Sequence, residues 1–268
     1  MSKSMLELYH ADTSVCAQKV RLALAEKGLA WSGHLLDLMA GDQFKPGYLQ
    51  LNPGAVVPTL IHDGHAIGES TLINEYLDEA FAASPLRPAD PLARVAMRLW
   101  TRQLDEGVHQ ATGVVSHGIV FRHLKMAGRT KDEVLAEVET IPDPARRERQ
   151  REAVTKGLKS RFFQAAARRL DGTMARMEEA LGHGPWLAGD SYSLADVGLT
   201  PYVTRLNDMR ILDAGGDRPR LADWFDRIRA RPSYETAIRQ WAPRSKLELM
   251  AGKGAEAAPR VRAILQAG

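Results

Sequence analysis

The feature that most constrains the fold is a change of pattern near residues 85–91. Over the first 82 residues, short apolar runs typical of strands alternate with helical stretches, in the order strand, helix, strand, irregular segment, strand, strand, helix. Pro85, Pro88 and Pro91 end this part, and the apolar patterns beyond them have helical spacing. The sequence therefore predicts an α/β domain over residues 1–84 and an all-helical domain over residues 90–268.

The N-terminal domain opens with a strand, a turn and a helix. Leu6, Leu8 and Tyr9 form a short apolar run, and polar residues 12–14 supply turn and N-cap chemistry. A helix should follow and end at Gly28, which stands where a C′ glycine is expected. Residues 31–38 alternate partly and predict a second strand, which would form a right-handed βαβ unit with the first if the two strands are parallel and adjacent.

A hairpin and a helix complete the predicted domain. Residues 56–61 read as a strand, and Asp63 with Gly64 forms a tight turn into a short partner strand. Ser70 is expected to cap a helix over residues 71–81, where apolar residues recur at spacings of three and four.

Two long helices dominate the prediction for the second domain. One apolar series runs from Leu92 to Val115, a second spans residues 162–181, and a shorter one spans residues 221–228. The charged segment 128–160 between the long helices should be broken at its prolines. We expect residues 252–259, rich in glycine and alanine, to be loosely held.

Composition excludes several functional classes. The formal net charge of +3 is too small to indicate nucleic-acid binding. The single cysteine, Cys16, excludes an intrachain disulfide and a cysteine-built zinc site, and we expect no bound metal. We see no signal sequence at residues 1–7 and no apolar run of roughly 18 residues that could span a membrane. These features predict a cytoplasmic protein.

Four local patterns occur together in one order along the chain. They are residues 13–16 at a strand-to-helix turn, Asn52 and Pro53 followed by Val57 and Pro58, Glu69 and Ser70 before a helix, and residues 193–196 as a capping box. In this combination the chain resembles the soluble glutathione transferases over nearly its whole length. The resemblance implies a thioredoxin-like N-terminal domain that binds glutathione and a helical C-terminal domain that holds an electrophile.

The resemblance also implies roles in glutathione binding. Val57, held by a cis peptide bond to Pro58, would pair its backbone with the cysteinyl unit as an added strand. Ser70 would receive the γ-glutamyl carboxylate and Glu69 the ammonium group. Gln43 and Lys45 are the candidates for the glycyl carboxylate. Taken singly, each motif also fits a structural explanation: an edge-strand proline, an ordinary helix cap, or solvated loop residues.

Ser14 is the candidate catalytic residue. Aligning residues 19–24 with the zeta-type pattern places Ser14 at the active serine of that class, where a hydroxyl at a helix start stabilises the glutathione thiolate. Thr13 is the fallback, and Tyr9 lies too early, within the strand. Cys16 would suit disulfide exchange, but it lacks a following proline and is also typical of a small buried side chain.

The substrate is suggested by a finer likeness. Residues 69–105 are similar to the bacterial β-aryl etherases, which cleave lignin-derived aryl ethers with glutathione, although the turn at residues 13–19 departs from theirs. Ser116, His117, Phe121 and Arg122 could line an aromatic pocket or belong to core and surface. The alternatives are a glutathione-dependent isomerase or dehalogenase and a noncatalytic ligand-binding protein. The family also implies a homodimer.

Overall fold

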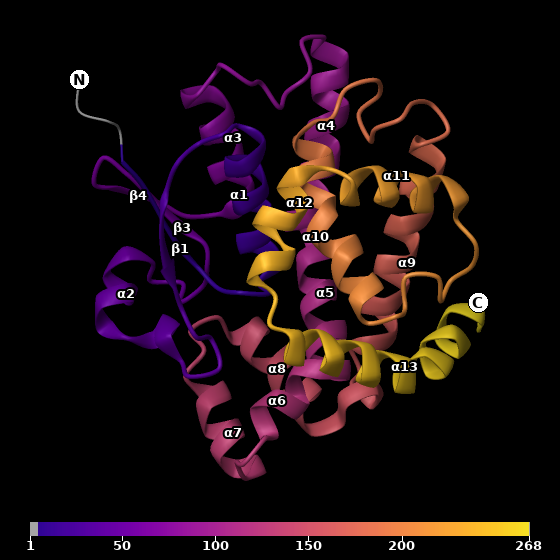
Figure 1. Ribbon diagram of the computed structural model, residues 1–268. Helices are drawn as coiled ribbons and strands as arrows, with labels where there is room; N and C mark the ends of the chain where they lie inside the picture. Colours follow the sequence, from indigo (N-terminus) through magenta and orange to yellow (C-terminus); the bar gives the residue numbers. More distant parts are fainter. Residues whose placement is uncertain (1–4, 268) are drawn as a thin grey trace. The chain divides into compact units, whose positions relative to one another are not determined.

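The computed structural model describes residues 5–267 and thus leaves residues 1–4 of the N-terminal segment outside the description (Figure 1). Contacts divide the chain into two compact units. The sheet unit comprises Met1–Arg102, Ala180–Pro201 and Ala222–Pro243, and the helical unit comprises Gln103–Glu179, Tyr202–Leu221 and Arg244–Gly268. In this division, two segments from later in the sequence belong to the sheet unit. The domain boundary between residues 84 and 90 stays a prediction.

The sheet has four strands in the order β2-β1-β3-β4. They are β1 (Leu6–His10), β2 (Ser32–Leu35), β3 (Thr59–His62) and β4 (His65–Ile67). β1 pairs with β2 in parallel and with β3 antiparallel, and β3 and β4 form the expected hairpin. The predicted second strand is shortened to four residues. Apolar side chains of β1 and β3 such as Leu8 and Leu60 are fully buried, and they anchor the core of this unit.

Three helices belong to the N-terminal part of the sheet unit: α1 (Val15–Glu26), α2 (Pro46–Leu51) and α3 (Ser70–Ala80). Gly28, with φ of 62°, follows α1 as predicted. The predicted cap of α3 is wrong. Glu69, at φ 60° and ψ 101°, precedes the helix, and Ser70 is its first residue. With α1 and α3 beside the sheet, this part has the thioredoxin-like fold that the sequence predicts (Figure 1).

The later segments of the sheet unit are helical: α4 (Pro91–Gln103), the first half of α10 (Leu194–Asp208), most of α11 (Pro219–Arg229), and α12 (Pro232–Ala237). The fully buried Asp196 carboxylate accepts hydrogen bonds from the Ser193 backbone N–H at 3.0 Å and from Trp224 Nε1 at 2.9 Å. The predicted return bond of the capping box is therefore present. Burial raises the pKa of Asp196 to about 6, although these donors act against the shift.

The helical unit contains the remaining helices: α5 (His109–Ser116), α6 (Arg122–Met126), α7 (Lys131–Glu139), α8 (Pro144–Lys156), α9 (Phe163–Ala180) and α13 (Arg244–Gln266). The predicted series from Leu92 to Val115 is not one regular helix. A π-helical turn over Leu104–Val108 interrupts it, and Gly107 there has φ of 142°. The helix predicted over residues 162–181 is confirmed as α9.

The expectation of a loosely held tail is wrong. Residues 252–259 lie within α13, a helix of 23 residues. A Cβ atom on Gly254 would stand 1.7 Å from the Met209 carbonyl oxygen, so the missing side chain lets two backbones approach closely. Ala257 and Ala258 are buried beside it. The small residues that suggested a loose tail are instead a packing surface.

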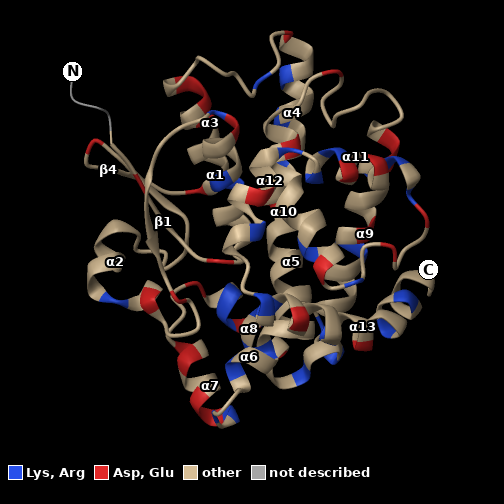
Figure 2. Ribbon diagram, viewed as in Figure 1, with Lys and Arg blue, Asp and Glu red and all other residues tan. Residues whose placement is uncertain are grey.

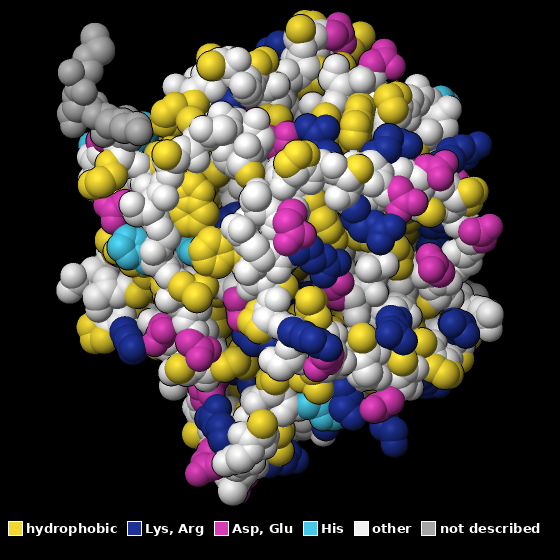
Figure 3. Space-filling model, viewed as in Figure 1, with side chains coloured by type: hydrophobic (Ala, Val, Ile, Leu, Met, Phe, Trp, Pro, Cys, Tyr) yellow, Lys and Arg dark blue, Asp and Glu magenta, His cyan; other side chains and the backbone are white. Residues whose placement is uncertain are grey.

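Charged side chains of both signs are spread along the chain. The segment 128–160 forms α7 and α8, separated by residues 140–143, and both signs occur along it (Figure 2). On the face seen in Figure 3, basic and acidic side chains are interspersed over the surface. Within residues 5–267, no helix is both long enough and apolar enough to cross a membrane.

Candidate active site at one end of the sheet

The sheet register brings four chain segments to the same end of the sheet. Because β2 is parallel to β1, and β3 runs opposite to both and to β4, this end holds the last residues of β1, β2 and β4 and the first residue of β3. The residue pairs that fix it are His10 opposite Leu35, Tyr9 opposite Thr59, and Leu60 opposite Ile67. The segments that continue from these strand ends carry Ser14, residues 43–45, Val57 and Glu69 with Ser70.

Ser14 lies where β1 gives way to α1. It is the N-cap of α1, with extended backbone angles, and the Ala17 backbone N–H donates to its Oγ at 3.3 Å. Ser14 is partly exposed, whereas Thr13 is buried and its backbone N–H donates to the Asp12 carboxylate. Cys16, also partly exposed, lies in the first turn of the helix and forms no disulfide. A hydroxyl hydrogen at Ser14 remains able to donate to an anion at the helix N-terminus.

The peptide bond between Val57 and Pro58 is cis, as the resemblance implied. β3 begins at Thr59, which pairs with Tyr9 of β1. Val57 stands two residues earlier, so its backbone lies outside the hydrogen-bonded part of the sheet. The preceding carbonyl, of Val56, accepts hydrogen bonds from the Tyr48 hydroxyl and, at 3.1 Å, from Asn52 Nδ2. Asn52 thus has a structural reason to be in the motif.

Tyr48 is a supporting residue that the sequence analysis missed. Its hydroxyl also contacts Thr59 Oγ1 at 2.9 Å, which ties the segment before Val57 to the start of β3. Its ring packs with Ala11, Leu36 and Val57 in a small apolar cluster. Burial raises the pKa of the Tyr48 phenol, so the hydroxyl stays protonated and donates.

Glu69 and Ser70 stand between the end of β4 and α3. Glu69 is exposed and has a positive φ, while Ser70 is only 6% exposed. Beside them, Lys19 of α1 is fully buried and donates from Nζ to Thr71 Oγ1 at 3.1 Å. A buried ammonium group next to a helix N-terminus makes this end of α3 favourable for an anion. Sequence reasoning missed Lys19 because its partner is 52 residues away.

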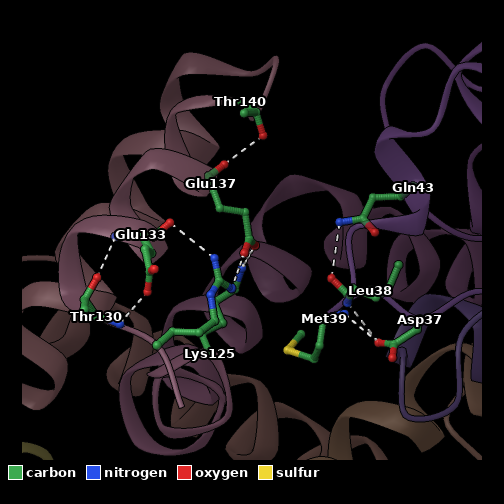
Figure 4. A network of polar contacts seen from close by, with 11 residues as sticks. Asp37, Leu38, Met39, Gln43, Lys125, Thr130, Glu133, Glu137 and Thr140 are labelled. Carbon is green, nitrogen blue, oxygen red and sulfur yellow. Dashed lines mark hydrogen bonds and ion pairs between the residues drawn. The ribbon is translucent and has the colours of Figure 1, made fainter. Parts of the chain in front are cut away.

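Gln43 and Lys45 have different surroundings. Gln43 is buried, and its Nε2 donates to the Leu38 carbonyl at 3.4 Å (Figure 4). Lys45 keeps its ammonium group in solvent, 71% exposed, and pairs with Asp42 at 2.7 Å. Of the two, Lys45 is free to turn toward a carboxylate, since an exposed ion pair of this kind contributes little stability.

The four other candidate residues lie in the helical unit, where Ser116, His117 and Phe121 share contacts and Arg122 does not join them. Arg205, which the sequence analysis did not select, donates from Nη1 to Ser116 Oγ at 3.1 Å and lies over the Phe121 ring at 4.8 Å. The His117 ring meets Phe121 edge-on at 5.3 Å. Arg122 instead points at Gly157, where a Cβ atom would stand 1.8 Å from its Nη1.

His117 is a neutral group in this cluster. Burial and, to a lesser extent, the cations Lys125, Arg146 and Arg205 together lower its pKa to about 3. Lys125 is itself paired with Glu137, which also binds Arg129 at 2.5 Å (Figure 4). A neutral imidazole can accept or donate a hydrogen bond but is a poor general acid near neutral pH. Among residues 5–267 there is no group of three His, Cys, Asp or Glu side chains that could hold a metal ion.

Comparisons with known proteins identify the family of this chain. The glutathione S-transferase N-terminal domain matches residues 8–85, and the glutathione S-transferase C-terminal domain matches residues 144–227. Protein LigF of Sphingobium sp. strain SYK-6 is 32% identical over 253 residues, which cover 91% of this chain and 95% of LigF. The tetrachloro-p-hydroquinone reductive dehalogenase of Sphingobium chlorophenolicum is 30% identical over 257 residues, covering 87% and 95%.

Solved structures give the same result. The crystal structure of the beta-etherase LigF superposes with a TM-score of 0.79 and 28% identity, covering 88% of this chain and 99% of that one. Glutathione transferase E6 of Drosophila melanogaster has a TM-score of 0.68 at 26% identity, covering 93% and 97%. The chain therefore belongs to the glutathione S-transferase family. It is related to both the etherase and the dehalogenase.

Proposed function

We propose that the protein is a glutathione transferase that directs the glutathione thiolate at an aromatic electrophile. The observation that carries the proposal is the convergence of four segments at one sheet end, each with a group suited to one part of the tripeptide. The family membership supports glutathione as the cosubstrate.

Each segment receives one role. The backbone of Val57 pairs with the cysteinyl unit of glutathione, and Pro58 directs the chain back into β3. Ser70 and the first N–H groups of α3 receive the γ-glutamyl carboxylate beside the buried Lys19 ammonium, and Glu69 receives the amino group. Lys45 and Gln43 serve the glycyl carboxylate.

Ser14 stabilises the thiolate. Its hydroxyl donates a hydrogen bond to the sulfur at the N-terminus of α1, where the helix dipole also favours negative charge. The nucleophile is the glutathione sulfur, and the serine forms no covalent bond. Thr13, buried next to Ser14, and Cys16 are the alternative thiol partners.

The reaction we propose is cleavage of a β-aryl ether next to a ketone, in line with the likeness to LigF. The thiolate attacks the carbon α to the carbonyl, so a carbon–sulfur bond forms as the carbon–oxygen bond breaks. The electron pair leaves on the phenolate, which takes a proton from water. Apart from thiolate stabilisation, this step requires an oriented aromatic substrate and support for the leaving oxygen.

A second candidate is glutathione-dependent dehalogenation or isomerisation of an aromatic compound. The likeness to the reductive dehalogenase of Sphingobium chlorophenolicum, at 30% identity, favours it nearly as well. A noncatalytic ligand-binding role is the third candidate.

We also propose a homodimer in the cytoplasm. Leu92, Val95 and Leu99 project from α4 at spacings of three and four and are 79%, 53% and 56% exposed. An exposed apolar helix face on the sheet unit is suited to pack against a second copy of the chain. Size-exclusion chromatography with light scattering tests it, and Leu92→Glu with Leu99→Glu should yield a monomer.

The deciding experiment is product analysis. Purified protein is incubated with glutathione and a β-aryl ether ketone whose released phenol fluoresces, in parallel with a chlorinated hydroquinone and a generic chlorinated aromatic acceptor. Phenol release that requires glutathione supports the etherase proposal, and chloride release from the hydroquinone supports the second candidate. Absence of glutathione binding by calorimetry contradicts the whole proposal.

A further inference from the structure

Arg21 occupies an unusual place in the sheet unit. It lies in the second turn of α1 with only 1% of the residue exposed. Its Nη1 and Nη2 donate to the backbone carbonyls of Ala11 and Asp12 at 3.0 and 2.8 Å. These carbonyls belong to the short segment between β1 and Ser14. The guanidinium group thus holds the turn that presents the candidate thiolate donor.

The same guanidinium group has three other partners. Its Nε donates to the Ala237 carbonyl of α12 at 2.7 Å, and its Nη1 donates to His10 Nδ1 at 3.0 Å. The Trp241 ring lies 5.3 Å from its Cζ. Arginine suits this position because the planar fork presents donors in several fixed directions, which a lysine ammonium does not.

His10 is an uncharged hydrogen-bond partner of the Arg21 guanidinium group. Burial and, to a lesser extent, the Arg21 charge lower its pKa to about 4, so at neutral pH the ring is uncharged and Nδ1 can accept the Arg21 hydrogen bond. The ring is held edge-on between Trp31 and Trp241, at 5.3 and 4.7 Å. Burial lowers the pKa of Arg21 to about 9, which leaves it charged at neutral pH.

We propose that Arg21 is a positioning residue for thiol activation: by fixing the carbonyls of Ala11 and Asp12, it sets the direction of the Ser14 hydroxyl toward the glutathione sulfur. The inference rests on the proposed function, since it presupposes a thiolate at Ser14. It goes beyond that function by assigning the precision of the site to a buried residue that touches neither substrate. A small rotation of the turn misdirects the hydrogen bond, which weakens steeply with its angle.

The test compares Arg21→Lys and Arg21→Gln with a matched control, Arg231→Lys. Arg231 also joins α12 to α1, through Glu26 at 2.6 Å, but it binds the far end of α1 and not the turn. For each variant, the ultraviolet absorbance of the bound thiolate is titrated against pH, the glutathione Kd is measured by calorimetry, and the melting temperature is recorded.

We expect both Arg21 variants to raise the pKa of the bound thiol by about one unit, a roughly tenfold loss of thiolate below that pKa. Glutathione Kd should change less than threefold, because Val57 and Ser70 are untouched. Arg231→Lys should lower the melting temperature and leave the thiol pKa as in the wild type. If Arg21→Gln does not fold, Arg21→Lys decides by itself.

Two results would overturn the claims separately. If wild-type protein lowers the thiol pKa and Arg21→Lys lowers it equally, Arg21 has only a structural role. If wild-type protein binds glutathione without lowering its thiol pKa, the proposed thiolate chemistry itself fails, whatever the Arg21 variants do.

Discussion

Replacing Ser14 tests the proposed chemistry, and the structure indicates how large the effect should be. Hydrogen bonds to charged groups contribute about 1.5–3 kcal/mol. Since one pKa unit corresponds to about 1.4 kcal/mol, Ser14→Ala should raise the pKa of the bound thiol by roughly one to two units. At a pH below the wild-type thiol pKa, kcat/KM should therefore fall roughly 10- to 100-fold, while glutathione still binds.

Ser14 also has a structural role that must be separated from catalysis. Its Oγ accepts the Ala17 N–H as the N-cap of α1, and losing such a cap typically costs about 1 kcal/mol of stability. Ser14→Gly removes the same hydroxyl at a capping cost of only a few tenths of a kcal/mol. The two variants should then lose activity equally and differ in their urea unfolding midpoints.

Thr130→Ala is the control for the cap alone. Thr130 caps α7 in the helical unit, where the Glu133 N–H donates to its Oγ1 at 3.3 Å. This variant should lose about 1 kcal/mol of stability and keep the wild-type profile of kcat/KM against pH. A wild-type thiol pKa in Ser14→Gly would refute the assignment and move the donor to Thr13 or a backbone N–H.

Three further predictions follow from other contacts. Ser70→Ala should weaken glutathione binding roughly tenfold by calorimetry with little change in kcat, because it removes a ground-state contact; an unchanged Kd contradicts the γ-glutamyl assignment. Gly254→Ala should cost about 3 kcal/mol in urea unfolding, since its Cβ would meet the Met209 carbonyl, whereas Gly252→Ala in the same helix has open space and should be neutral or stabilising. The pKa of His117 is lowered to about 3, so the folded state stays neutral while the unfolded state gains a proton below pH 6.5; stability should fall as pH falls from 6.5 toward 3. His117→Gln should remove about 1.4 kcal/mol per pH unit from the slope of unfolding free energy against pH in this range. The raised pKa of Asp196 acts in the opposite direction below pH 6 and is the same in both proteins. An unchanged slope would contradict the burial of a neutral His117.

Local patterns predicted most of the elements. The strand at Leu6, the hairpin turn at Asp63 and Gly64, and helix α9 all follow from apolar periodicity and turn chemistry that act over a few residues. β1 and β2 do pair in parallel, which meets the condition for the βαβ unit that the strand–helix–strand order allowed. Residues that belong to one element and one local rule were therefore within reach of sequence reasoning.

The errors share a different cause. Nothing in the pattern around Glu69 signals its positive φ, so the start of α3 was placed one residue late. Gly107 stands inside a helical apolar series, and only its backbone angle reveals the break. The tail was misjudged because Gly254 is explained by the Met209 backbone, 45 residues away. In each case the deciding interaction or angle is absent from the local periodicity.

The supporting residues of the candidate site were missed for a related reason. Tyr48 holds the Val56 carbonyl, and Arg21 holds the carbonyls of Ala11, Asp12 and Ala237. Every residue type supplies a backbone carbonyl, so no side-chain pattern at the accepting positions could mark these contacts. Only the donors can be recognised in the sequence, because they are polar residues in a helix that is otherwise expected to be buried. Lys19 and Arg21 of α1 are examples. A buried polar side chain without a hydrogen-bond partner lowers the stability of the folded protein. A charged residue in a core helix therefore indicates that it binds a partner elsewhere in the chain, such as a backbone carbonyl. In this chain Lys19 and Arg21 follow that rule, and both reach segments of the proposed glutathione site.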